Sequence, residues 1–239
     1  EQPSLSATSI QTYKTCPLKY KYRYVDNIPG APEKPYFKLG KVIHKVLEIF
    51  HKDKLSAFDE LINLLDMHWQ KGGYQYEQEQ EQNREDAEIM LKNYWNYIQL
   101  NPVNTLYTEH WFSFKTKYVN LHGKCDRIDL DDGNNIIIID YKTSKSSETK
   151  RQLKKNVQLG IYAMFSIMEG VEFEDNKIRG LPKKLSMLFL RKEEPEVSVV
   201  FTEDDIDKFH EDIRLVTEKI QKGQFESCKG RCCDWCDYK

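Results

Sequence analysis

Residues 121–142 read LHGKCDRIDLDDGNNIIIIDYK, and this stretch decides the fold class. Asp126 lies in a strand-like run, the polar letters DDGN follow, and Asp140 ends the apolar run IIII. Asp, Gly and Asn in that order are typical of a hairpin turn, so we expect two adjacent strands here. Side chains two positions apart on a strand share one face, which puts Lys142 beside Asp140. The hairpin can bring Asp126 next to that pair.

Two carboxylates beside a lysine suit one kind of chemistry. A hard divalent cation prefers oxygen ligands, and a bound dication lowers the pKa of a water molecule until it can attack. The pattern Asp-x-Lys also arises often by chance. Its interpretation therefore depends on the rest of the chain.

The composition is that of an ordinary globular protein. The 239 residues are 39% hydrophobic and carry a net charge of −2. This net charge does not indicate a polyanionic partner. There is no apolar run long enough to span a membrane and no opening signal peptide, so we expect a cytoplasmic protein without a membrane partner. Two basic clusters stand out, although a solvated face is their ordinary explanation. They comprise Lys14, Lys19, Lys21 and Arg23, and Lys145, Lys150, Arg151, Lys154 and Lys155.

The hydrophobic period predicts helices first and then a mixture of strands and helices. The run Ile136–Ile139 is apolar on both faces, which indicates a central, buried strand. We find no internal repeat and no clear linker, so we expect one α/β domain over residues 1–239 with a helical lobe inserted at 53–100. The first predicted helix is capped by Ser6, Thr8 or Ser9 and runs to about Cys16. The other predicted helices are 38–52, 56–70, 82–100, 148–169 and 203–222, and the predicted strands are 106–117, 118–130, 135–142, 185–191 and 197–201.

Several polar side chains interrupt these apolar patterns. His44 lies on or beside the apolar stripe of its helix, and Glu109 lies within an aromatic strand. A partly buried histidine and an edge-strand charge are the ordinary explanations. Asp126 and Asp140 are harder to explain in that way, because burying an unpaired carboxylate is costly, so each is expected to meet a cation or a base. The chain contains no G-x-x-x-x-G-K-[ST] phosphate loop, which excludes a P-loop ATPase within it.

The cysteines form a second group. Four of the six fall within the last twelve residues, and in a cytosolic chain of this size metal or cluster ligation is more typical of such crowding than disulfides. Reduced surface thiols are the alternative, and Cys125 is interpreted as an ordinary strand residue. The other five are Cys16, Cys228, Cys232, Cys233 and Cys236.

Five motifs follow one another along the chain: LGKVIH with His44, TEH with Glu109, GKCDRID with Asp126, IDYK with Asp140 and Lys142, and QLGIYA with Gln158 and Tyr162. In this order they resemble the PD-(D/E)XK nuclease superfamily, and within it the RecB-like exonucleases. The nuclease domain that follows the motor in UvrD/RecB-type helicase–nucleases is especially similar. The resemblance spans most of the chain and implies a restriction-endonuclease-like α-β-β-β-α-β core with a mixed central sheet. The two ends, SIQTYKTCPLKYKY and CDWCDYK, also match this family.

The resemblance implies a role for each residue. His44, Asp126 and Asp140 would bind Mg²⁺ or Mn²⁺ together with the backbone carbonyl of Tyr141, and Glu109 would support a metal or its water. The imidazole makes Mn²⁺ more suitable than it would be in an all-oxygen site. Lys142 would help to deprotonate the attacking water or neutralise developing charge. Gln158 and Tyr162 would line the DNA path and steady the site.

Iron–sulfur members of the family carry one cysteine far upstream and three near the C-terminus in a C-x₂-C-x₅-C pattern. Cys16 matches the first, and Cys233 and Cys236 match the C-x₂-C, but the last would fall beyond Lys239. Cys228 or Cys232 is the alternative ligand. A [4Fe–4S] cluster held in this way would join the two cysteine-bearing ends, 1–24 and 225–239. Zinc is the main alternative for four thiolates.

The function expected from this reasoning is a metal-dependent deoxyribonuclease. We expect an exonuclease acting in DNA repair or recombination on single-stranded ends delivered by a helicase motor, in cis or in trans. Aromatic and basic side chains would stack on bases and follow the backbone. A stand-alone phage-type or CRISPR-associated exonuclease and a catalytically inactive DNA-binding module are the alternatives. The start at Glu1 and the end short of an expected cysteine suggest a domain taken from a longer protein.

Overall fold

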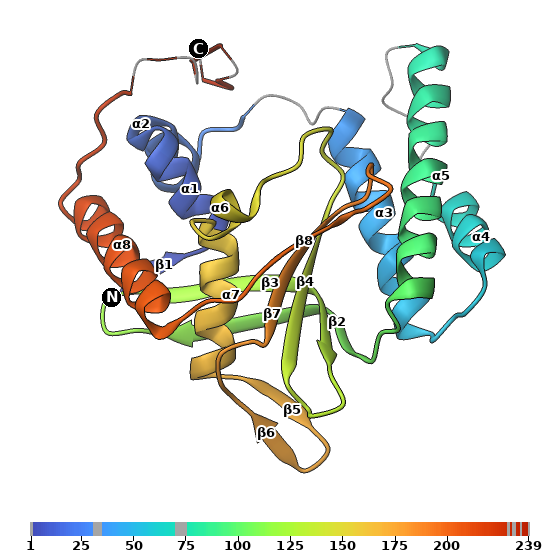
Figure 1. Cartoon of the computed structure of the whole chain (residues 1–239). Helices are drawn as coiled ribbons and strands as arrows, with labels where there is room; N and C mark the ends of the chain where they lie inside the picture. The colour runs from blue at the N-terminus through green and yellow to red at the C-terminus, as the bar shows by residue number, and fades with distance from the viewer. Residues whose placement is uncertain are drawn as a thin grey trace.

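A six-stranded mixed sheet carries the acidic residues that the sequence singles out (Figure 1). The structure is a computed structural model that describes residues 2–30, 35–69, 76–228, 230, 233–234 and 236–238. In the sheet, β3 pairs with β1, β2 and β4, and the order continues from β4 to β7 and β8. The pairs β1–β3 and β4–β7 are parallel, and the others are antiparallel. The strands are β1 (Ser4–Leu5), β2 (Thr105–Lys115), β3 (Asn120–Leu130), β4 (Ile136–Lys142), β7 (Lys184–Phe189) and β8 (Glu196–Val199). The predicted α/β fold class is confirmed.

The β3–β4 hairpin forms where the sequence predicts it. Asp131 closes the turn, because its Oδ1 accepts hydrogen bonds from the backbone N–H groups of Gly133 at 2.9 Å and Asn135 at 2.8 Å. Asn134 adopts the left-handed conformation, with φ of 57°, which Asn tolerates better than most residues. β4 is then covered on both sides and pairs with β3 and β7, so the expected central strand is confirmed.

Helices cover both faces of this sheet (Figure 1). One buried cluster joins the sheet to α1, α7 and α8, and a second joins β4 and β7 to α3, α4 and α5. The metal-site candidates therefore lie where the second helical layer meets the sheet. The helices are α1 (Ala7–Thr15), α2 (Pro17–Tyr20), the π-helix η1 (Lys21–Val25), α3 (Pro35–Lys52), α4 (Phe58–His68), α5 (Glu77–Leu100), α6 (Lys150–Leu153), α7 (Val157–Met168) and α8 (Glu203–Gln221).

The structure differs from the predicted elements in several places, and the short strand β1 was not predicted. The helix predicted at 148–169 is divided into α6 and α7, because the Asn156 side chain accepts hydrogen bonds from the N–H groups of Gln158 and Leu159 and starts a new helix. A short hairpin of β5 (Val171–Phe173) and β6 (Asn176–Ile178) was not predicted. The helix expected at 82–100 begins earlier, at Glu77. Position 70, the last of the predicted helix 56–70, lies outside the described residues.

None of the helices in the described ranges combines the length and the apolar character needed to cross a bilayer. The division of the chain into one domain with a lobe at 53–100 stays a prediction. In the structure, α3 packs with α4 and α5, the two helices of that segment, through apolar side chains of all three.

Candidate metal centre

Three predicted side chains from three elements meet at one point. His44 comes from α3, Glu109 from β2 and Asp126 from β3, and their ligand atoms lie within 4.8 Å of one another. The Nδ1 atom of His44 is 3.3 Å from Asp126 Oδ1 and 3.9 Å from Glu109 Oε1. Ligands around one octahedral Mg²⁺ lie at most about 4.2 Å apart, because each is about 2.1 Å from the ion. The spacing therefore suits a single cation.

The backbone fixes the two carboxylates. The N–H of Tyr141 donates a 2.7 Å hydrogen bond to Asp126 Oδ2, so β4 orients the side chain that β3 supplies. Glu109 has a φ of 49°, a left-handed conformation that is rare for a non-glycine residue within a strand. Such local strain persists where the surrounding structure enforces it and is often found at functional sites.

Asp140 lies near this group, although its carboxylate is not among the described ligand atoms that lie within 4.8 Å of one another, and α7 holds it in place. Its Oδ1 accepts hydrogen bonds from Gln158 Nε2 at 2.8 Å and from the Tyr162 hydroxyl at 3.2 Å. Tyr162 is itself buried, and its hydroxyl shares its one proton between Asp140 Oδ1 and the carbonyl of Lys124, which is 2.8 Å away. The predicted Gln158 and Tyr162 therefore steady a buried carboxylate, and Tyr162 does so from behind the site.

Lys142 lies beside Asp140, as the strand spacing predicts. Its Nζ is 2.6 Å from Asp140 Oδ2 and donates a 3.0 Å hydrogen bond to Gln158 Oε1. Burial disfavours the charged ammonium, but Asp140 outweighs burial and raises the pKa of Lys142 above its ordinary value. Lys142 is therefore a cation near neutral pH, which suits it to neutralise negative charge more than to remove a proton.

Burial and neighbouring carboxylates change the pKa values of Asp140 and His44. Burial raises the pKa of Asp140, and the nearby Asp126 adds to that increase. Burial disfavours a charged His44, yet Asp126 and Glu109 outweigh it and raise the pKa of His44 to about 10. Asp140 Oδ2 makes no hydrogen bond to any described residue and has only the Lys142 ion pair. One imidazole nitrogen with several carboxylate oxygens fits Mg²⁺ or Mn²⁺.

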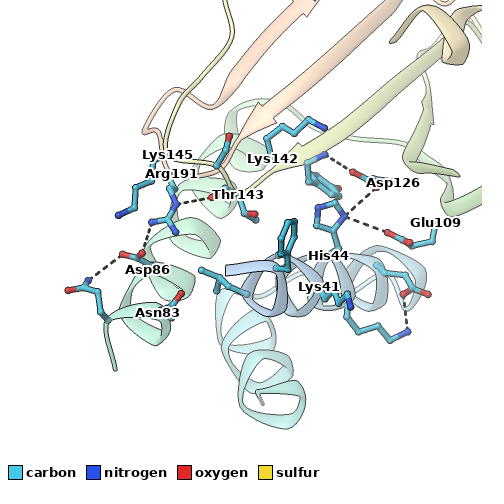
Figure 2. A pocket seen from close by; sticks show the side chains of 18 of the residues that line it. Lys41, His44, Asn83, Asp86, Glu109, Asp126, Lys142, Thr143, Lys145 and Arg191 are labelled. Carbon is cyan, nitrogen blue, oxygen red and sulfur yellow. Dashed lines mark hydrogen bonds and ion pairs between the residues drawn. The ribbon is translucent and has the colours of Figure 1, made fainter. Parts of the chain in front are cut away.

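His44, Glu109, Asp126 and Lys142 line a hollow of about 1,090 Å³ between α3, α5 and the end of β4, whereas Asp140 is not among its lining residues. Figure 2 shows His44 pointing from α3 toward Asp126 and Glu109, with Arg191 across the hollow near Thr143 and Asp86. Arg191 donates to the Thr143 carbonyl at 2.8 Å and pairs with Asp86 at 2.5 Å. The other cations that line the hollow are Lys41, Lys45, Lys124, Lys142 and Lys145.

The basic clusters seen in the sequence contribute only in part. Lys145 lines this hollow, but Lys14, Lys19 and Lys21 each form an ion pair with an aspartate of the chain. Lys154 pairs in the same way with Asp205 at 2.7 Å. Most of the positive charge at the site therefore comes from residues outside those clusters.

Two residues near the site were not predicted from the sequence. Lys124 pairs with Glu109 through its ammonium, and it shares a strand face with Asp126, which is two positions away, so alternation could have identified it. Arg127 of β3 is completely buried on the side of α3 and α5 and donates hydrogen bonds to Tyr94 and Tyr141. Its partners come from distant elements, and the local pattern gives no sign of them.

The two cysteine-bearing ends lie together, away from the metal centre. Asp237 pairs with Lys19 at 3.1 Å, and the Tyr238 hydroxyl donates to the carbonyl of Ile28 at 3.0 Å. Burial opposes a thiolate at Cys16, but backbone hydrogen bonds from Cys228 and from α2 outweigh it and lower the pKa of that thiol. Cys233 and Cys236 follow in the same terminal segment, and Cys232 lies outside the described residues. Among the described cysteines no three sulfurs lie within ligand distance of one another.

Comparison with known proteins agrees with this geometry. No curated protein is significantly similar to the chain. A crystal structure of a candidate exonuclease from Eubacterium rectale is similar over 97% of this chain and 87% of its own, with a TM-score of 0.54 and 10% identity, which supports the fold. A solved protein named SSO0001 covers 100% of this chain and 84% of its own at 15% identity, with a TM-score of 0.44. A sequence model of the PD-(D/E)XK nuclease superfamily matches residues 4–239. The chain thus belongs to the PD-(D/E)XK nuclease superfamily.

Proposed function

We propose that this chain is a Mg²⁺- or Mn²⁺-dependent deoxyribonuclease that degrades DNA from single-stranded ends. The observation that carries the proposal is the meeting of His44, Glu109 and Asp126 beside the Asp140–Lys142 pair, in a hollow lined by lysines. Membership of a nuclease superfamily supports the reaction class. The exonuclease mode and the preference for DNA ends rest on the resemblance to RecB-like enzymes, and the cytoplasmic setting rests on the sequence pattern alone.

The residues of the site have different roles in the proposed hydrolysis. His44, Asp126, Asp140 and the carbonyl of Tyr141 would hold the cation, with Glu109 beside them. A bound cation of this kind supplies a water of lowered pKa and offsets negative charge on the phosphate. Lys142, kept charged by Asp140, lies next to the metal ligands and would neutralise charge on the same phosphate. Gln158 and Tyr162 keep Asp140 in position through hydrogen bonds.

The hollow suits a polyanionic strand. Lys41 and Lys45 come from α3, Lys145 follows β4, and Arg191 follows β7, so cations surround the metal ligands on several sides. Phosphate contacts of this kind supply affinity without sequence information and weaken as salt rises. The proposal therefore includes binding that depends on ionic strength and that tolerates many sequences.

The test of this proposal is the set of products from end-labelled DNA. We expect cleavage of single-stranded DNA only with Mg²⁺ or Mn²⁺ present, complete inhibition by EDTA, and labelled products that shorten progressively from one end. Double-stranded DNA of the same sequence and a circular single strand are the comparisons. Cleavage of the circle would exclude a strict exonuclease, and no cleavage under any metal condition would leave only the DNA-binding module.

The wider setting follows from the resemblance to the nuclease domain of UvrD/RecB-type helicase–nucleases. We propose that a helicase motor, in cis or in trans, delivers unwound strands to this site during DNA repair or recombination. The stand-alone phage-type or CRISPR-associated exonuclease is the second candidate. The coding sequence around this chain separates them, because only the first requires an adjacent motor.

We also propose that a [4Fe–4S] cluster joins the two ends through Cys16, Cys233, Cys236 and one of Cys228 or Cys232. The proximity of the ends supports this proposal, since Asp237 and Tyr238 contact the segment that follows Cys16. The lowered pKa of Cys16 favours the thiolate form that ligates metals. Ligation would draw the sulfurs closer than they are in the described residues.

Metal analysis of anaerobically purified protein tests the cluster. We expect a broad visible absorbance band and close to four iron atoms per chain, both lost in Cys16→Ser, because each cluster iron needs its own thiolate. Cys125→Ser is the matched control, since Cys125 is buried in β3 away from the ends. Zinc without iron would establish zinc as the bound metal. If neither metal is found, the cysteines are reduced thiols without a cluster.

A further inference from the structure

A large aromatic side chain lies exposed beside the metal centre. Trp111 of β2 is 71% exposed, more than any other tryptophan, tyrosine or phenylalanine that the structure describes. Single exposed hydrophobic residues are common and need no special explanation. The position of Trp111 is what sets it apart.

The strand geometry places the indole on the face that carries the metal ligands. His110 and Phe112 both pack against Phe165 of α7, so Glu109 and Trp111, which alternate with them, lie on the opposite face. Two residues along a strand span about 6.6–6.8 Å. The ring is therefore one side-chain step from Glu109.

A lysine connects the indole to the site. Lys124 is the cross-strand partner of Trp111, and its ammonium lies 5.7 Å from the ring centroid in a cation–π contact. The same ammonium pairs with Glu109, and Lys124 lines the hollow of the metal centre. The indole of Trp111, the ammonium of Lys124 and the carboxylates at the metal centre therefore lie next to one another on β2 and β3.

An aromatic ring can contact the base of a nucleotide, and a lysine and a metal ion can contact its phosphates. We propose that the indole of Trp111 stacks on an unpaired base next to the phosphate that the metal centre holds, with Lys124 at the phosphate between them. The inference rests on the proposed function, because it names how the same site holds its substrate. An unpaired base offers a free π-face, whereas a base inside a duplex is already stacked on both sides. The ligand class is therefore single-stranded DNA.

Binding to an inactive protein tests the stacking. In an Asp140→Asn background with Mn²⁺, we expect Trp111→Ala to bind a 12-nucleotide oligothymidylate about 5- to 150-fold more weakly, the range that corresponds to the loss of one stacked base. Trp111→Phe should retain most of the affinity, because the smaller ring still stacks. Intrinsic fluorescence should be quenched by the oligonucleotide in the Trp111 protein and much less in Trp111→Phe.

Abasic nucleotides locate the contact. Moving one abasic residue along the strand should find a position that weakens binding to the Trp111 protein but adds nothing to the defect of Trp111→Ala. Leu100→Ala is the matched control, because Leu100 is 83% exposed at the end of α5 away from the hollow and should bind as the parent does.

The outcomes separate this inference from the proposed function. Equal affinity of Trp111→Ala and the Trp111 protein, or additive losses at every abasic position, would overturn the stacking while the wild-type chain still cleaves DNA. A wild-type chain that neither cleaves nor binds DNA would overturn both.

Discussion

The Asp140→Asn variant is expected to lose metal-dependent cleavage of DNA by at least about 10³-fold. Asn keeps the shape of the side chain and removes the charge that the cation and Lys142 both use. A metal ion contributes several kcal/mol of transition-state stabilisation, and each 1.36 kcal/mol corresponds to a tenfold change in rate. Single-turnover rates with saturating protein and Mg²⁺ give the measurement without contributions from product release.

The design of this experiment depends on a folded variant. Asp140 is almost completely buried, with 2% of its surface exposed, so circular dichroism and thermal melting must accompany the rates. Asp132→Asn is the matched control, because Asp132 is an exposed acid in the turn of the same hairpin and should cleave at the parental rate. Parental cleavage by Asp140→Asn would mean that Asp140 is not required for the reaction.

The part of the site on the β3–β4 hairpin could be predicted from local rules. A turn sequence fixes the hairpin, and the two-residue strand period fixes the side of each residue, so Asp126, Asp140 and Lys142 converge without any knowledge of tertiary packing. In the structure this convergence is visible in the bond from the Tyr141 N–H to Asp126 and in the pairing of Asp140 with Lys142.

The remainder of the site required more than local rules. His44 lies on a helix whose packing against the sheet no local pattern reports, and only the resemblance to a nuclease family connected it to Asp126. The division between α6 and α7 was missed for a related reason. Asn156 can cap a helix or sit within one, and the choice depends on hydrogen bonds that apolar periodicity does not describe.

Arg127 is the clearest case in which a sequence pattern misleads. It follows Asp126 in β3, where alternation alone suggests the opposite face and an apolar side chain. Instead its guanidinium is buried toward α3 and α5, where the two protons of Nη1 are shared among the Tyr94 hydroxyl at 2.5 Å, His51 Nε2 at 3.0 Å and the Tyr141 hydroxyl at 3.1 Å. Burial, with Arg127 adding to it, lowers the pKa of His51 to about 3, so this ring is neutral and accepts the bond.

The buried Arg127 connects helices α3 and α5 to strand β4, which carries Asp140 and Lys142. Tyr94 belongs to α5 and His51 to α3, whereas Tyr141 lies between Asp140 and Lys142 on β4. Asp129, two residues along β3, pairs with Arg127 Nε at 3.0 Å and is itself buried. The position of β4 relative to α3, which carries His44, therefore depends in part on a single guanidinium.

We expect Arg127→Met to lower the free energy of unfolding by about 3–5 kcal/mol, because breaking a buried ion pair from one side leaves the other charge unpaired. For a chain of this length the melting temperature should fall by roughly 6–20 °C. The double variant Arg127→Met/Asp129→Leu should recover much of this loss, since it removes both charges. Urea titrations of the single and double variants measure the difference.

The same variants separate stability from positioning of the site. If Arg127 orients β4 against α3, the double variant should fold well yet bind Mn²⁺ more weakly, because the Tyr141 hydroxyl keeps only its bond with Tyr94 while the Tyr141 N–H still bonds Asp126. Isothermal titration with Mn²⁺ at a temperature where both proteins are folded gives this affinity. Parental Mn²⁺ affinity in the double variant would restrict Arg127 to stability, and parental stability of Arg127→Met would show that the ion pair with Asp129 contributes nothing measurable.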